Sequence, residues 1–211
     1  MCMRFGFPGR DTYFDWIHLR DSFYTYAKKT NIVIEIGASA KTRTRELTVR
    51  CAKIIGVELM RERLPQDFEN VKYKLGDWET LTKVIAPNSA DLLISNQVLE
   101  HVVHDKKVLN ETYAVLKKNG IALICTPNRT RFLQNLVDKL SGKERVFPWA
   151  EHIREYTKDD LIKLVKQSKF KKYDLRSYVF GIHAGPFYFY LENPPAPLEK
   201  WANFLELQLF K

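Results

Sequence analysis

The chain has 211 residues, enough for one substantial hydrophobic core and too few for two comfortable domains. Hydrophobic residues make up 45% and charged residues 28%, which is typical of a globular protein and excludes a disordered or fibrous one. No apolar run reaches the ~20 residues that a transmembrane helix needs, and the first ten residues lack the pattern of a secretory signal. The three cysteines follow no metal or redox spacing, so we expect a cytoplasmic protein without a membrane span.

The net charge of +9 raises the question of an anionic partner. The basic residues are dispersed in short groups, such as Lys28-Lys29 and Lys171-Lys172, and no block of five or six occurs. This pattern favours solvated helix faces. Binding to nucleic acid stays open but is not favoured.

The predicted elements alternate between short apolar runs and amphipathic stretches. An aromatic-rich helix is expected over residues 11–29 as an N-terminal addition. Strands are then expected over residues 32–36, 53–58, 70–74, 91–95 and 121–125, and helices over residues 41–52 and 105–116. Strand and helix at this spacing predict βαβ units and a mostly parallel sheet.

The C-terminal part continues the alternation. Thr157 is a good N-cap, followed by acids in the first turn of a predicted helix. A sixth strand is expected after Phe170, and residues 205–210 alternate with a period of two, which favours a closing strand. The aromatic stretch over residues 185–190 is compatible with either helix or strand.

Small and acidic residues follow the predicted strands where each strand ends. Glu35 and Gly37 close the first run, Glu58 ends the second, and Asp77-Trp78 follow the third. Because open parallel sheets bind ligands beyond the carboxyl ends of their strands, we expect these residues to share one site. A glycine allows close approach of the backbone, an acid about twenty residues later can accept ribose hydroxyls, and an acid beside an aromatic suits adenine. The order predicts a ligand that contains a nucleoside.

Residues 32–170 resemble the class I methyltransferase family, in the branch called the methyltransferase type 11 or 23 domain. The matching motifs are Val33-Ile34-Glu35-Ile36-Gly37, Ile55-Gly56-Val57-Glu58-Leu59, Gly76-Asp77, Asp91-Leu92-Leu93-Ile94-Ser95-Asn96-Gln97-Val98-Leu99-Glu100-His101, Leu116-Lys117-Lys118-Asn119-Gly120 through Thr126-Pro127-Asn128-Arg129, and Glu151-His152-Ile153-Arg154-Glu155-Tyr156-Thr157. The resemblance covers about two thirds of the chain, in order and at the family's spacing.

The resemblance implies a Rossmann-like α/β fold, with a seven-stranded, mostly parallel sheet, helices on both faces and a reversed last strand. Residues 1–211 would form a single methyltransferase domain, with an N-terminal helical addition (1–30), a cofactor-binding core (31–128) and substrate-side helices and last strands (129–211). It also implies S-adenosyl-L-methionine as cofactor. The residues carried over by position to cofactor binding are Glu35, Gly37, Ala38, Ser39, Lys41, Glu58, Leu59, Asp77, Trp78, Asn96 and Gln97.

One departure from the family pattern concerns its first motif. Ser39 and Lys41 occupy the positions of the usual second and third glycines. Lys41 could pair with the methionine carboxylate of the cofactor, or it could narrow the pocket. A catalytically degenerate binding or scaffold domain is therefore an alternative to an active enzyme, although the retained Glu58 and Asp77 favour cofactor binding.

Histidines are the candidate proton acceptors, because imidazole titrates near neutral pH. His101 lies just past the fourth strand and His152 precedes the Thr157 helix, so both are catalytic candidates at the cofactor edge. His104, three residues after His101, would permit metal ligation on a helix, but without a third ligand in view no metal is predicted.

The acceptor class follows from motifs that are missing. Where amino-methylating nucleic-acid enzymes carry an Asn/Asp-Pro-Pro-aromatic tetrad, this chain has Ser95-Asn96-Gln97-Val98. Cys125 lies inside a predicted buried strand, which does not suit the exposed nucleophile of cytosine-carbon enzymes. These features favour a small-molecule acceptor. An RNA or protein methyltransferase that uses the basic surface is the alternative, and the oligomeric state stays open.

Overall fold

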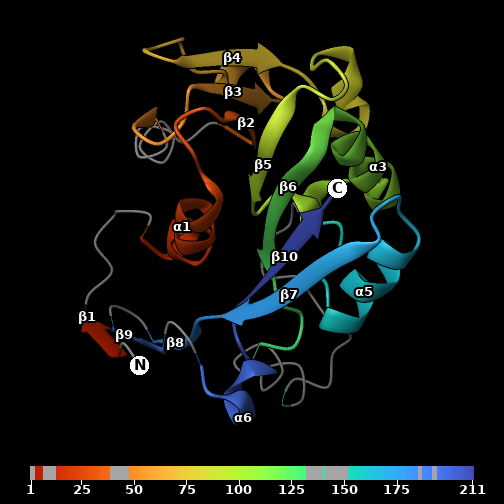
Figure 1. The fold of residues 1–211 in the computed structure, drawn as a ribbon. Coiled ribbons are helices and arrows are strands. Elements are labelled where there is room, and N and C mark those ends of the chain that lie inside the picture. Colours follow the sequence, from red (N-terminus) through yellow and green to blue (C-terminus); the bar gives the residue numbers. More distant parts are fainter. Residues whose placement is uncertain are drawn as a thin grey trace.

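A seven-stranded sheet forms the centre of the protein (Figure 1). The computed structural model describes residues 3–6, 13–38, 48–131, 140, 152–184, 187–191 and 194–211. The strands of this sheet, in spatial order, are β4 (Val71–Leu75), β3 (Lys53–Glu58), β2 (Ile32–Ile36), β5 (Ala90–Asn96), β6 (Leu116–Pro127), β10 (Phe204–Phe210) and β7 (Lys172–Tyr178). Neighbours from β4 to β6 pair in parallel, and β10 is antiparallel to both β6 and β7. The predicted Rossmann-like sheet with a reversed last strand is confirmed.

Alternating side chains of the central strands fill two separate cores, one on each face of the sheet. Ile34 of β2 pairs in register with Leu93 of β5, and both belong to the larger core. Val33 and Leu92, one residue earlier in each strand, belong to the other core. Because successive strand residues point to opposite faces, continuous apolar runs are required when helices cover both faces.

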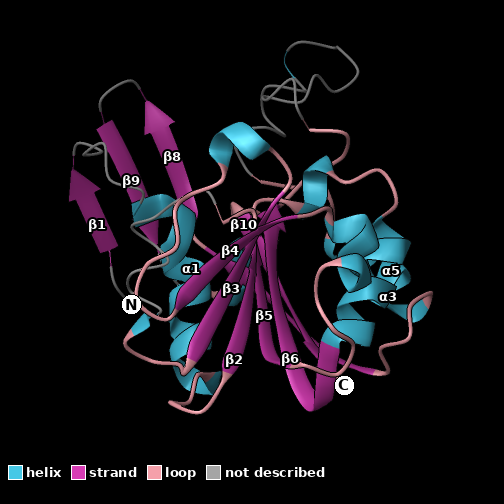
Figure 2. Cartoon of the chain, turned by 90° about the horizontal axis from the view of Figure 1, so that it is seen from above, coloured by secondary structure: helices cyan, strands magenta, loops and turns pink. Residues whose placement is uncertain are grey.

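Helices cover the two faces unequally (Figure 2). The helix α1 (Tyr13–Tyr26) packs on one face, whereas α3 (Asp105–Val115) and α5 (Lys158–Lys166) cover the other. Shorter helices are η1 (Arg61–Arg63), η2 (Trp78–Lys83), η3 (Leu99–His101) and α6 (Ala196–Glu199). The predicted cap of α5 is confirmed, because the Thr157 hydroxyl accepts the N–H of Asp160 at 3.1 Å. In the described part of the chain, no helix has both the length and the apolar character needed to cross a bilayer.

A second, three-stranded sheet was not predicted. It consists of β1 (Met3–Gly6), β9 (Phe187–Leu191) and β8 (Phe180–Ala184), in that order and antiparallel (Figure 2). Of the aromatic stretch left open between helix and strand, residues 187–190 are therefore strand, and the N-terminal addition contains a strand as well as a helix. Val179, with a φ of 58°, separates β7 from β8, and its left-handed backbone redirects the chain out of the main sheet.

One predicted helix ends earlier than expected, and another lies mostly outside the described residues. The helix expected over residues 105–116 ends one residue earlier, at Val115, and the strand expected over residues 121–125 is longer, because β6 begins at once with Leu116. Within β6, Asn119 has a φ of 65°, and its N–H donates to the carbonyl of Lys211, the residue after β10. Most of the helix expected over residues 41–52 lies outside the described residues.

Candidate cofactor and acceptor site

A pocket of about 650 Å³ opens at the carboxyl edge of the parallel strands. Each of four strands contributes residues where it ends: Gly37 after β2, Glu58 at the end of β3, Asp77 after β4, and Asn96 at the end of β5. The strand order reverses direction between β2 and β5, and ligands of open α/β sheets bind at such a switch point. The pocket thus lies where the sequence predicts a ligand site.

Gly37 makes the turn that shapes one wall of the pocket. Its φ is +69°, a backbone conformation that residues with a side chain rarely adopt. Its N–H donates to the carbonyl of Val57 at 2.9 Å. A Cβ at this position would lie 2.7 Å from Cγ2 of Val98, which also lines the pocket. A glycine is therefore required here. Ser39 and Lys41, the two departures from the family pattern, lie outside the described residues.

Two carboxylates in the pocket are held by backbone N–H groups. Oε1 of Glu58, whose residue is only 6% exposed, accepts the N–H of Met60 at 3.1 Å. Oδ1 of Asp77 accepts the N–H of Glu79 at 2.8 Å and caps η2. In each case the backbone N–H of the residue two positions later holds one carboxylate oxygen. The side chains are therefore oriented before a ligand binds.

The remaining predicted cofactor residues lie at different depths. Trp78 lines the pocket but is 4% exposed, and its Nε1 donates to Thr112 at 2.9 Å, so it also belongs to the core. Gln97 lines the pocket with a φ of 58°, and Leu59 lies at its rim, 66% exposed. Ala38 and Glu35 are buried and, in the described part of the chain, are not among the residues that line the pocket.

Several lining residues were missed by the sequence analysis. Met60 and Arg63 follow β3, Glu79 lies in η2, and Val98 and Val102 flank η3. Val98 lies within a family motif that gives it no role, and the other four positions belong to no motif. Only the rule that residues beyond each strand end face the ligand could have indicated them.

The two predicted catalytic histidines lie beside each other, and one of them lines the pocket. His101, on η3, lines the pocket, and its ring centroid is 4.8 Å from that of His152, with the rings nearly perpendicular. The loop that carries His152 is tied to η3, because the N–H of Ile153 donates to the carbonyl of Glu100 at 3.0 Å. The two histidines, 51 positions apart in sequence, are thus held beside each other.

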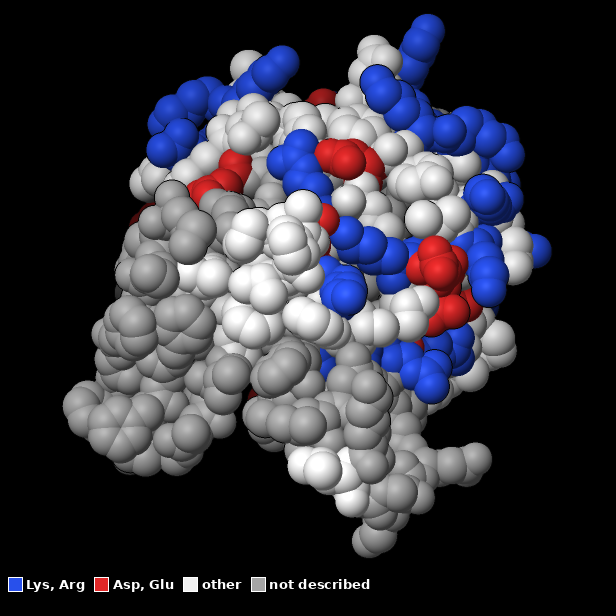
Figure 3. Space-filling model, turned by 90° about the horizontal axis from the view of Figure 1, so that it is seen from below, with Lys and Arg blue, Asp and Glu red and all other residues white. Residues whose placement is uncertain are grey.

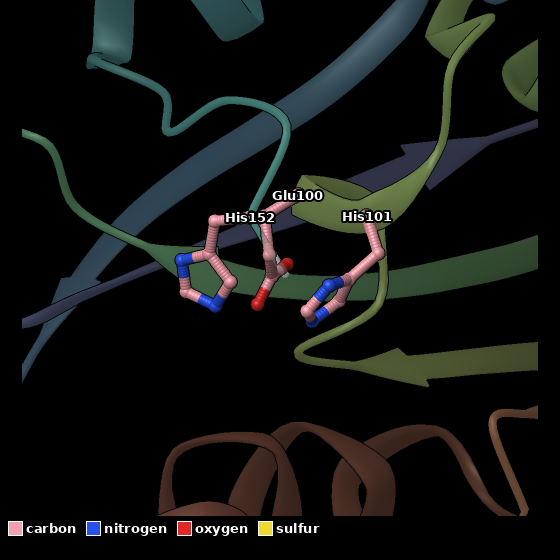
Figure 4. Close-up of side chains that lie close together, drawn as sticks. All are labelled: Glu100, His101 and His152. Carbon is pink, nitrogen blue, oxygen red and sulfur yellow. The ribbon is translucent and has the colours of Figure 1, made fainter. Parts of the chain in front are cut away.

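Glu100 lies between these histidines (Figure 4). It is fully buried, and its Oε2 accepts a hydrogen bond from the Thr126 hydroxyl at 3.1 Å. No group among the described residues donates a hydrogen bond to its Oε1. Burial raises the pKa of the Glu100 carboxyl to about 8. Glu100 belongs to a family motif, but no role was predicted for it.

His152 is oriented by a buried ion pair. Its Nδ1 lies 3.2 Å from Oε1 of Glu155, and Arg131 binds both oxygens of that carboxylate at 2.7 and 3.0 Å. Burial lowers the pKa of His152, and this effect exceeds the opposing effect of Glu155. Because the pKa is lowered, the ring is neutral at pH 7. Since the ion-paired carboxylate only accepts hydrogen bonds, Nδ1 is assigned the proton and Nε2 the lone pair.

His104, considered as a partner of His101, turns elsewhere. It precedes α3, its side chain is 66% exposed, and its Nδ1 lies 2.6 Å from Oε2 of Glu79. The polar group beside His101 therefore consists of Glu100 and His152 instead.

Comparison with known proteins identifies the family. A methyltransferase-domain model matches residues 54–176, more than half of the chain. The chain therefore belongs to the S-adenosylmethionine-dependent methyltransferases, and S-adenosyl-L-methionine is the cofactor of this family.

Individual relatives are distant. A ubiquinone biosynthesis O-methyltransferase from Ruegeria sp. (strain TM1040) is 22% identical over 161 residues, 71% of this chain and 64% of the relative. This chain thus spans less than two thirds of that protein's length. The structure of the YcgJ protein from Bacillus subtilis has a TM-score of 0.69 at 17% identity, covering 92% of this chain and 97% of that one. A possible histamine N-methyltransferase from Thermotoga maritima has a TM-score of 0.61 at 21% identity, with 86% and 82% covered. These likenesses establish the class I fold.

Proposed function

We propose that this chain transfers a methyl group from S-adenosyl-L-methionine to a small-molecule acceptor. The observation that carries the proposal is the continuity of one pocket, which runs from Glu58 and Asp77 to His101 at the carboxyl edge of the sheet. The names of two relatives, a ubiquinone biosynthesis O-methyltransferase and a possible histamine N-methyltransferase, also indicate small acceptors.

The cofactor supplies an electrophilic methyl group, so the protein's tasks are to hold both reactants and to remove a proton where the acceptor requires it. Glu58 is proposed to accept hydrogen bonds from the ribose hydroxyls and Asp77 from the adenine amino group. The turn at Gly37 lets the backbone approach the methionine part. Asn96 is proposed to form the wall near the sulfonium.

The acceptor is proposed to bind next to His101. His152, neutral and with Nδ1 engaged by Glu155, offers the lone pair of Nε2 as a general base. A pocket of about 650 Å³ is within the usual range for a cofactor or a drug-sized ligand.

The charge distribution on one face of the protein supports a small acceptor more than a nucleic acid. In the view of Figure 3, Lys and Arg side chains form scattered groups with acidic side chains between them. A nucleic-acid site is expected to present a continuous basic stripe.

Calorimetric titration with S-adenosylmethionine and S-adenosylhomocysteine tests the cofactor site. We expect micromolar binding, about −8 kcal/mol, by the native chain. Glu58→Ala should weaken it at least about tenfold, because a charge-assisted hydrogen bond is lost. Glu62→Ala is the matched control, since Glu62 is exposed and is not among the lining residues. No binding by the native chain would favour the scaffold alternative.

A screen for the acceptor completes the test. Release of S-adenosylhomocysteine is measured with phenols, amines and carboxylic acids, and with total RNA as the competing class. Turnover with a small molecule supports the proposal. Turnover with RNA alone, falling steeply with salt, would contradict it.

A further inference from the structure

We propose that Glu100, His101 and His152 together bind a divalent transition-metal ion, such as Zn²⁺ or Co²⁺, at the acceptor end of the pocket. The proposal rests on the proposed function only in placing the ion beside the acceptor. Its first evidence is proximity, because one ligand atom from each of the three side chains lies within 4.8 Å of the others (Figure 4).

The donor set suits such an ion. Two imidazole nitrogens and one carboxylate oxygen are ligands that Zn²⁺ and Co²⁺ accept, whereas Mg²⁺ and Ca²⁺ prefer oxygen alone. Donor atoms around one tetrahedral zinc lie about 3.4 Å apart, so the two most distant donor atoms must approach each other by at most about 1.4 Å on binding. His101 borders the open pocket and can rotate to close that gap, while Thr126 holds Glu100.

An unsatisfied buried oxygen is the second, independent observation. Glu100 is 0% exposed, yet among the described residues nothing donates to its Oε1. A buried carboxylate oxygen without a partner is costly. A cation between the two rings would satisfy it, because Figure 4 shows the Glu100 carboxylate between His101 and His152.

The surroundings of His152 supply the outer layer that metal-binding histidines need. Its Nδ1 contacts the Glu155 carboxylate, which Arg131 binds in turn with two hydrogen bonds. A carboxylate behind the ring fixes its orientation and tautomer, and directs Nε2 toward a metal. Glu155 is 4% exposed, so this support is rigid.

The number of ligands indicates what the ion would do. Structural zinc sites are closed by four protein ligands, whereas sites with three keep a position open. Since His101 also lines the cofactor pocket, the open position would face the pocket. The ion would hold an oxygen acceptor there and favour its deprotonated form, and the displaced proton would leave to water.

Metal binding is tested directly on the full chain, prepared without a histidine tag and stripped with a chelator. Titration calorimetry with ZnCl₂ should show one equivalent bound. His152→Ala and Glu100→Gln should each weaken binding at least tenfold. His104→Ala should bind like the native chain, because His104 faces Glu79 outside the cluster.

Cobalt provides a second readout. Co²⁺ should give visible absorption bands that His152→Ala loses and His104→Ala keeps. If Glu100→Gln fails to fold, judged by circular dichroism, His101→Ala replaces it. Absence of zinc binding, or equal binding by the native chain and His152→Ala, would overturn the proposal. Because S-adenosylmethionine binding is measured without metal, the proposed function is judged separately, and the histidines would then remain its candidate base.

Discussion

Two buried glutamates lie in different regions of this protein and share an unusual electrostatic state. Glu100 lies on η3 at the carboxyl edge, and Glu206 lies within β10 against α1. Burial raises the pKa of the first to about 8 and of the second to about 7. In each carboxyl group, one oxygen has no hydrogen-bond partner among the described residues.

The two glutamates differ in the groups that surround them. Oε1 of Glu206 accepts hydrogen bonds from the Ser22 hydroxyl at 2.5 Å and from Nε2 of Gln208 at 2.6 Å, both uncharged groups between helix and sheet. Glu100 has two imidazoles beside it, one of which lines the pocket. A raised pKa in a buried carboxyl thus does not identify a functional site by itself. Reactive neighbours and access to a pocket do.

The largest expected effect comes from His152→Ala. The ring is a ligand or, without metal, a base, so methyl transfer should fall about 10²- to 10⁴-fold. Affinity for S-adenosylmethionine should change little, because His152 is not among the residues that line the cofactor pocket in the described part of the chain. Steady-state kinetics with His104→Ala and E206Q as controls should show near-native rates. Full turnover by His152→Ala would contradict a functional role for the region around Glu100.

A stability measurement probes Glu206. Its folded-state pKa of about 7 exceeds the unfolded value of 4.5, so the folded state holds the proton more tightly. The resulting stabilisation is fully present below pH 4.5 and is lost as the pH rises toward 7. Urea unfolding should therefore show the native chain losing about 3 kcal/mol between these limits relative to E206Q. The exposed pair member Glu199, changed to Gln, should show no such dependence. A flat difference for E206Q would mean that Glu206 is not held protonated.

Gly37→Ala should distort the turn after β2 at the carboxyl edge of the sheet and leave the region around Glu206 unchanged. The φ of +69° and the contact with Val98 require backbone movement, at a cost of about 1–2 kcal/mol. We expect a lower melting temperature together with weaker cofactor binding. E206Q, on the other side of the comparison, should leave that binding intact. Native affinity in Gly37→Ala would show that this turn does not shape the ligand site.

The smallest effect is expected from removing one hydroxyl donor at each glutamate. Ser22→Ala should cost about 1 kcal/mol and raise the pKa of Glu206 further, because its hydrogen bond lowers that pKa. Thr126→Val should cost a similar amount, but it should also weaken Zn²⁺ binding, since Thr126 holds Glu100. Equal metal binding by Thr126→Val and the native chain would indicate that Glu100 needs no such support.

The sequence predicted the parts of the fold that depend on local pattern. The strands β2, β3 and β5 are continuous apolar runs, and β10 alternates, so their periods were readable. The strand β1 was missed, because four residues carry no measurable period and its partner Leu191 is far along the chain. The burial of the Phe23 side chain was not predicted, because the helix α1 is barely amphipathic.

The site was predicted to the extent that it follows strand ends. Gly37, Glu58, Asp77 and Asn96 all line the pocket, because chain order fixes which strand end faces which. The role of Glu100 was not readable. It depends on the loop before α5 returning to η3, through hydrogen bonds between segments about fifty residues apart.

The position of β10 has a consequence for biosynthesis. This strand is made after β7, yet it lies between β6 and β7 and is the only strand that pairs with β7 among those described. In a nascent chain that has emerged only as far as β7, one edge of β6 is therefore open, and β7 has no partner among the described strands. The strands from β4 to β6 can pair before residues 204–210 leave the ribosome, but β7 can join the main sheet only afterwards, and until then the open edge of β6 is a place where another chain could pair.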